Sequence, residues 1–149
     1  MYFALAGANT AATIRKVTDM KTQTMRDAKL VVVIDDDPLV LEATAGLLSS
    51  WGCEVVTAAT YGAALDQLTG LSRRPDLIIC DYRLSEGSTG VDVIEGLRSI
   101  YEIPALLISG DPLLPDDGEK PVGGYCLLQK PFDATRFRAA LIGASVLQG

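Results

Sequence analysis

Short runs of apolar residues alternate along the chain with longer stretches in which apolar residues recur every three or four positions. The short runs predict β-strands, and the longer stretches predict amphipathic helices between them. Repetition of this alternation is typical of βα units arranged around a parallel sheet. The expected strands cover residues 30–34, 54–58, 77–80, 105–108 and 126–128.

Local signals place helices between these strands. Pro38 suits the first turn of a helix that Gly52 would end. A second helix is marked by apolar residues at a spacing of three, namely Val91, Ile94, Leu97 and Ile100. The last helix is expected to bury Phe137, Ala140, Leu141 and Ala144. The chain therefore predicts an α/β fold, a flavodoxin-like doubly wound sheet of five parallel strands.

Length and composition fit one domain, since 149 residues with 48% hydrophobic content suffice for a single core. No run approaches the roughly 20 apolar residues that span a bilayer, and residues 1–11 lack the basic start of a secretory signal. We therefore expect a cytoplasmic protein without membrane contact. The three cysteines show no C-x-x-C spacing, so we expect reduced core thiols at Cys53, Cys80 and Cys126.

Charge is distributed unevenly along the chain. Residues 1–29 contain five basic and two acidic side chains, whereas the rest contains eight basic and 17 acidic ones. The acidic body argues against direct binding of nucleic acid. We expect residues 1–28 to be an N-terminal extension or linker and residues 29–149 to form the domain.

Acidic residues follow two of the predicted strands. Asp35 and Asp36 follow the first strand in "VVVIDDDPLV", and Asp81 follows the third in "PDLIICDYRL". With strand order 2-1-3-4-5 these strands are neighbours, and ligands of such sheets bind outside the carboxyl ends of the strands. A hard cation such as Mg²⁺ would offset the repulsion and leave one carboxylate as a nucleophile. Alternatively, the first acidic run only caps the next helix, which leaves Asp81 without a role.

Two further strands end in residues that suit a phosphoryl group. Ser109 follows the fourth strand in "ALLISGD", and Lys130 follows the fifth in "LLQKPF". The hydroxyl would donate a hydrogen bond to a phosphorylated aspartate, and the ammonium would supply a point charge. Gly110 would leave room for the phosphoryl oxygens and for attacking water.

These motifs resemble the receiver domain of bacterial two-component response regulators. "VIDDDP", "ICDYRL", "LISGD" and "LQKPF" occur in order, and the resemblance covers about residues 29–147. It implies that Asp81 is the phosphoacceptor and that Asp36 binds Mg²⁺ directly while Asp35 supports the ion through water. It also implies that the backbone carbonyl of Arg83 is a metal ligand.

The resemblance further implies that Ser109 contacts the phosphoryl group, that Lys130 pairs with it, and that the Lys130–Pro131 peptide is cis. Asp37 would face outward and cap the first helix. The implied partner is a histidine kinase or a histidine phosphotransfer protein, whose phosphohistidine supplies the phosphoryl group. This chemistry is self-phosphorylation followed by autodephosphorylation, as distinct from that of a turnover enzyme. The side chain of Arg83 is expected to tune the dephosphorylation.

The sequence departs from the family pattern near its usual output surface. Residues 111–124 contain three prolines and three glycines, so the family's fourth helix is expected to be short or irregular. Leu127 replaces the aromatic residue that often serves as a switch, and Tyr125 is either a core residue or a substitute for it. We expect a stand-alone phosphate relay or sink, or a piece similar to the receivers that end hybrid histidine kinases. The oligomeric state stays open.

Two other functions use the same residues. Asp35-x-Asp37 is similar to the opening motif of haloacid-dehalogenase-type phosphatases, with Ser109 and Lys130 as later motifs, but the acidic pair expected after the lysine is missing. A pseudo-receiver, which binds a protein partner without phosphorylation, is the second alternative. The complete acidic set argues against it, whereas the altered segment 111–124 favours it.

Overall fold

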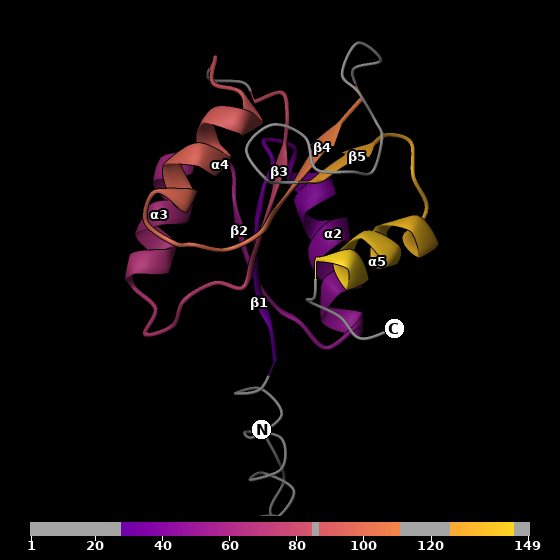
Figure 1. The fold of residues 1–149 in the computed structure, drawn as a ribbon, viewed down its shortest axis with the longest axis horizontal. Helices are drawn as coiled ribbons and strands as arrows, with labels where there is room; N and C mark the ends of the chain where they lie inside the picture. Colours follow the sequence, from indigo (N-terminus) through magenta and orange to yellow (C-terminus); the bar gives the residue numbers. More distant parts are fainter. Residues whose placement is uncertain (1–27, 85–86, 111–125, 145–149) are drawn as a thin grey trace, which may run out of the picture.

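Five parallel strands form the centre of the computed structural model, which describes residues 28–84, 87–110 and 126–144 (Figure 1). The strand order is β2-β1-β3-β4-β5, as predicted. Sequence order reverses at β1, whose two neighbours are β2 and β3. The strands are β1 (Leu30–Ile34), β2 (Glu54–Ala58), β3 (Leu77–Asp81), β4 (Ala105–Ser109) and β5 (Cys126–Gln129).

Three strands end one residue later than predicted. Asp81 is the last residue of β3 and lies opposite Ile108, and Ser109 is the last residue of β4 and lies opposite Gln129. The prediction was wrong by one position because it followed side-chain polarity, whereas a strand continues for as long as its backbone pairs with a neighbour. The sheet itself therefore fixes the backbone at Asp81 and Ser109.

Helices cover both faces of the sheet. In Figure 1, α3 and α4 lie on one face and α2 and α5 on the other. Each face has its own apolar core, one around Ile78 and Ile94 and the other around Ile79 and Phe137. The helices of the described residues are α2 (Pro38–Ser50), α3 (Tyr61–Thr69), α4 (Gly90–Arg98) and α5 (Ala134–Gly143).

The predicted limits of α2 are confirmed. Asp37 is its N-cap and Pro38 opens its first turn, as expected for a residue with a fixed φ and no N–H. The chain then turns at Gly52, where φ is +89°, a backbone conformation that glycine adopts without strain.

The predicted extent of α4 was wrong at its C-terminal end. The helix ends at Arg98, and Ile100 lies beyond it with 53% of its surface exposed. The N–H groups of Ile100 and Tyr101 both bond to the Leu97 carbonyl, which turns the chain out of the helix. Ile103 contributes to the core in place of Ile100.

The last helix buries Phe137 and Leu141 as predicted, with Ala140 and Ala144 partly buried beside them. The thiols are free, as predicted: Cys53 and Cys80 are buried and Cys126 is half-buried. None of the helices in the described residues is both long and apolar enough to cross a bilayer. The expected irregular segment 111–124, Tyr125 and nearly all of the predicted N-terminal extension lie outside the described residues.

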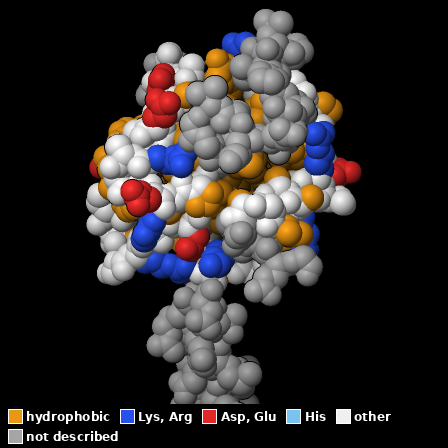
Figure 2. Space-filling model, viewed as in Figure 1, with side chains coloured by type: hydrophobic (Ala, Val, Ile, Leu, Met, Phe, Trp, Pro, Cys, Tyr) orange, Lys and Arg blue, Asp and Glu red, His pale blue; other side chains and the backbone are white. Residues whose placement is uncertain are grey.

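Ion pairs and hydrogen bonds connect the starts of three strands at the end of the sheet where the chain enters β1. Arg73 bonds to the Glu54 carboxylate, to the Ala28 carbonyl oxygen and, at 3.4 Å, to Asp76. Asp76 also accepts a hydrogen bond from the Leu30 N–H at 2.8 Å. Figure 2 shows basic and acidic side chains gathered beside one another at this end. These contacts fix the starts of β1, β2 and β3 relative to one another.

Candidate functional site

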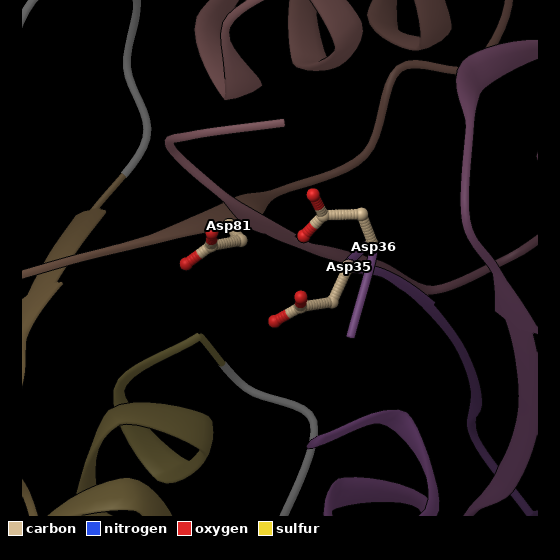
Figure 3. A group of neighbouring side chains, drawn as sticks. All are labelled: Asp35, Asp36 and Asp81. Carbon is tan, nitrogen blue, oxygen red and sulfur yellow. The ribbon is translucent and has the colours of Figure 1, made fainter. Parts of the chain in front are cut away.

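Three carboxylates meet at the carboxyl ends of β1 and β3. One carboxylate oxygen from each of Asp35, Asp36 and Asp81 lies within 4.8 Å of the other two. Figure 3 shows the three groups extending in the same direction from the two neighbouring strands. The convergence predicted from the strand order is confirmed by this geometry.

Backbone hydrogen bonds hold the β1 side of the cluster in place. The Asp35 N–H donates to the Ala58 carbonyl at 3.1 Å, which extends the pairing of β1 with β2 by one residue. Oδ1 of Asp35 accepts a hydrogen bond from the Asp37 N–H at 3.0 Å, and Oδ1 of Asp37 accepts one from the Leu39 N–H at 2.9 Å. Asp37 is therefore the helix cap, as predicted, and Asp35 and Asp36 remain at the cluster.

Ser109, at the end of β4, and Lys130, directly after β5, lie at the same edge of the sheet. Nζ of Lys130 lies 3.0 Å from Oδ1 of Asp81. The Lys130 N–H donates to the Ser109 carbonyl at 2.7 Å. This bond continues the pairing of β4 with β5 by one residue beyond Gln129. The Lys130–Pro131 peptide is cis, as the resemblance implied. The structure thus brings Lys130 to Asp81 and places Ser109 in the adjacent strand end.

Burial singles out the same edge. Among the described residues, the buried polar side chains are Asp35, 6% exposed, and Ser109, 2% exposed. Burying a polar group costs free energy unless it is compensated, so these two side chains mark the edge as a candidate functional site.

Burial is the main cause that raises the pKa of Asp35 above its usual value of 3.8. The hydrogen bond from the Asp37 N–H and the charge of Lys130 act to lower this pKa, while the charges of Asp81 and Asp36 raise it further. The neighbouring Cys80 thiol also has a raised pKa, because it is buried and lies near Asp81 and Asp35. Burial and the neighbouring carboxylates together outweigh the effects of the Asp37 N–H and of Lys130 on the pKa of Asp35.

The donor set fits a hard divalent cation. Mg²⁺ takes oxygen ligands at near-octahedral geometry and is held in proteins by one or two carboxylates together with waters. Asp35, Asp36 and Asp81 supply only oxygen atoms, and one carboxylate oxygen of each lies within 4.8 Å of the other two. These three residues would hold the ion.

Arg83 lies two residues after β3, with its backbone in an antiparallel bridge to Thr89. Its carbonyl stays a predicted metal ligand. Gly110 follows Ser109, and a Cβ atom there would lie 3.9 Å from the side chain of Lys130. Gly110 therefore borders the lysine that reaches Asp81, and its role in leaving room for the phosphoryl oxygens stays a prediction.

Sequence reasoning missed Gly90, the first residue of α4. A Cβ atom at this position would overlap the Asp81 carbonyl oxygen and would lie 2.7 Å from Cδ1 of Leu107. The helix can approach β3 this closely only because residue 90 has no side chain. The sequence signal was "STG", a cap residue followed by glycine, but nothing in it indicates which backbone the glycine approaches.

The family model and the curated relatives that match this chain point to the same family. The model of the response regulator receiver domain matches residues 31–142. The phyllosphere-induced regulator PhyR of Methylorubrum extorquens is 28% identical over 140 residues, which cover 91% of this chain and 52% of that protein. The transcriptional regulatory protein KdpE of Mycobacterium tuberculosis is 34% identical over 119 residues, which cover 77% of this chain and 50% of KdpE. The chain thus spans about half the length of these curated relatives.

Solved structures agree with the sequence relatives. The receiver domain of PhyR from Erythrobacter litoralis superposes with a TM-score of 0.68 at 28% identity, covering 82% of this chain and 93% of that domain. The observed strand order and the helices on both faces match this fold.

Proposed function

This chain belongs to the response regulator receiver domain family, and from that membership we propose that it accepts a phosphoryl group on Asp81. The donor is the phosphohistidine of a histidine kinase or of a histidine phosphotransfer protein. One observation carries the proposal: Nζ of Lys130 lies 3.0 Å from Oδ1 of Asp81, at the edge where Asp35 and Asp36 converge.

The proposed reaction exchanges one bond to phosphorus for another. A carboxylate oxygen of Asp81 attacks the phosphorus atom, the bond between phosphorus and the donor imidazole nitrogen breaks, and an acyl phosphate forms. Lys130 and Ser109 stabilise the charge on the transferring oxygens and hold them in line. Attack of water on the acyl phosphate then releases inorganic phosphate and restores the carboxylate.

Mg²⁺ is the proposed cofactor, held by Asp35, Asp36 and Asp81 with the Arg83 carbonyl as a further ligand. When bound, the ion would neutralise negative charge on the carboxylate and phosphoryl oxygens. We also propose that residues 29–149 form the receiver and residues 1–28 an extension or linker, in a cytoplasmic protein. Because the chain spans about half of its curated relatives, its output and its pathway are not assigned.

Intact mass after incubation with Mg²⁺ and acetyl phosphate tests the proposal. We expect a phosphoryl adduct that is lost in alkali, and Asp81→Asn should abolish it because the amide cannot attack phosphorus. Asp66→Asn is the matched control, since Asp66 is an exposed carboxylate on α3. Absence of an adduct on the wild type would contradict the proposal and favour the pseudo-receiver, which binds a partner without phosphorylation.

A further inference from the structure

The start of α4 is packed directly against the backbone of the proposed phosphoacceptor. A Cβ atom on Gly90 would overlap the Asp81 carbonyl oxygen and lie 2.9 Å from its carbonyl carbon, closer than the about 3.0 Å that real Cβ atoms respect. It would also press on Leu107 of β4. A backbone atom cannot move aside as the end of a flexible side chain can, so the contact with Asp81 is the harder of the two to relieve.

Main-chain bonds connect this contact to the predicted metal ligand. The Gly90 N–H donates to the Tyr82 carbonyl at 2.7 Å, and the Tyr82 N–H donates to the Ile108 carbonyl at 2.7 Å. Next to them, Arg83 and Thr89 form an antiparallel bridge. Tyr82 and Arg83, at the start of the connection between β3 and α4, are thus held to Thr89 and Gly90 at its end.

The helix begins at this point for a separate reason. Thr89 is the N-cap, and its side chain accepts a hydrogen bond from the Asp92 N–H while the Asp92 side chain accepts one from the Thr89 N–H. This capping box fixes the first turn of α4 and therefore the place of Gly90. The bond from the Gly90 N–H to the Tyr82 carbonyl ties this first turn to the residue after Asp81, so a side chain at residue 90 acts on the end of β3 as well as on α4.

We propose that Gly90 is a positioning residue for the chemistry at Asp81, an inference that rests on the proposed function. By allowing α4 to contact the Asp81 carbonyl, Gly90 sets the direction of the Asp81 side chain and of the Arg83 carbonyl. A side chain at residue 90 displaces the end of β3, so it weakens Mg²⁺ binding and slows phosphoryl transfer without touching either ligand.

The test compares Gly90→Ala with the wild type by two measurements. Calorimetric titration gives the Mg²⁺ affinity of the unphosphorylated protein, and intact mass against time gives the rate of adduct formation from acetyl phosphate. We expect both to fall by about 10- to 100-fold, as for other residues that orient metal ligands. Unchanged affinity and rate in a folded Gly90→Ala protein would overturn the proposal, even if its stability had fallen.

Two controls separate position from stability. Gly46→Ala adds the same methyl group to α2, where no atom lies within 4 Å of the new Cβ, and it should leave both measurements unchanged. Leu97→Ala opens a cavity under α4 at a residue with 0% exposure and lowers stability away from the site. It should not change the Mg²⁺ affinity of the folded protein, and an equal loss in this variant would overturn the proposal.

If Gly90→Ala does not fold, the same substitution is made in a protein that already carries Leu107→Ala. Leu107→Ala removes the side chain that a Cβ at residue 90 would press on, and it leaves the overlap with the Asp81 carbonyl. We expect Gly90→Ala to lower the Mg²⁺ affinity in this background also; equal affinity with and without it would overturn the proposal. If the wild type binds Mg²⁺ but forms no adduct, the proposed function fails, and the comparison of affinities still decides the role of Gly90.

Discussion

The Asp35 carboxyl group lies buried between the end of β1 and two further acidic side chains. Its pKa is raised in the folded protein, mainly by burial, so its ionised form is less favourable there than in the unfolded chain. The stability that follows from this shift is present below the ordinary pKa and is lost as pH rises through the folded pKa. At neutral pH without metal, ionised Asp35 therefore lowers the free energy of unfolding.

We expect Asp35→Asn to raise Tm by a few degrees at neutral pH in the presence of EDTA. The amide is neutral and of similar size, and its oxygen can still accept the hydrogen bond from the Asp37 N–H. The difference should disappear as pH falls below 3.8, where the unfolded carboxyl group also becomes protonated. Thermal melts across this range, with Asp66→Asn for comparison, measure the effect; a lower Tm for Asp35→Asn at neutral pH would contradict it.

Arg83 is exposed two residues after the proposed phosphoacceptor, on the connection between β3 and α4. We predict that the side chain at this place borders the approach of water to the acyl phosphate. We expect Arg83→Ala to shorten the lifetime of the adduct severalfold, because the smaller side chain opens this approach. The decay of the adduct by intact mass is the measurement, and Arg74→Ala, an exposed arginine on the loop before β3, is the control. An unchanged lifetime would remove Arg83 from the mechanism.

At the scale of the elements, Asp37 serves as the N-cap of α2, whereas Asp35 and Asp36 lie in the carboxylate cluster. Its carboxylate caps the helix by accepting the Leu39 N–H. We expect Asp37→Ala to lower the free energy of unfolding by about 1 kcal/mol, as for other lost N-caps, and to leave the adduct in place. Asp37→Ser keeps an acceptor and should retain most of the stability. Urea unfolding of both variants checks this, and loss of the adduct in Asp37→Ser would assign Asp37 to the chemistry.

The periodicity of the chain predicted these elements well where side chains determine them. The strands follow from apolar runs, and α2, α4 and α5 follow from apolar spacing and from Pro38. The strand ends at Asp81 and Ser109 did not, because backbone pairing continues under polar side chains. The bounds of α3 were not predicted. The role of Gly90 could not be predicted either, since it depends on which backbone α4 approaches after folding.

At the scale of the whole molecule, the crowded carboxylates couple the stability of the fold to metal binding. A ligand that binds only the folded state stabilises it, by about 2.7 kcal/mol when its concentration is 100 times its Kd. We therefore expect Mg²⁺ to raise Tm by several degrees and Asp36→Asn to remove most of this increase. Thermal melts with and without Mg²⁺ measure it, with Asp66→Asn as control. An equal increase in Asp36→Asn would place the ion elsewhere.

The strand order, the two apolar faces and the meeting of Asp35, Asp36 and Asp81 were all predictable, because a parallel sheet brings the carboxyl ends of its strands to one edge. The 3.0 Å distance between Nζ of Lys130 and Oδ1 of Asp81 could not be predicted from the sequence. The roles of these residues in binding metal and phosphoryl groups stay predictions until the adduct is measured.

The contacts of Arg73 with the Ala28 carbonyl, Glu54 and Asp76 lie at the opposite end of the strands from Asp81. A strand of five residues rises about 16 Å, so a protein fused ahead of Ala28 is attached at least that far from the acceptor carboxylate. A fluorescent or affinity tag at this junction should therefore leave the approach of a phosphodonor unobstructed. For reporters and immobilised forms of this domain, the amino-terminal side is the favourable point of attachment.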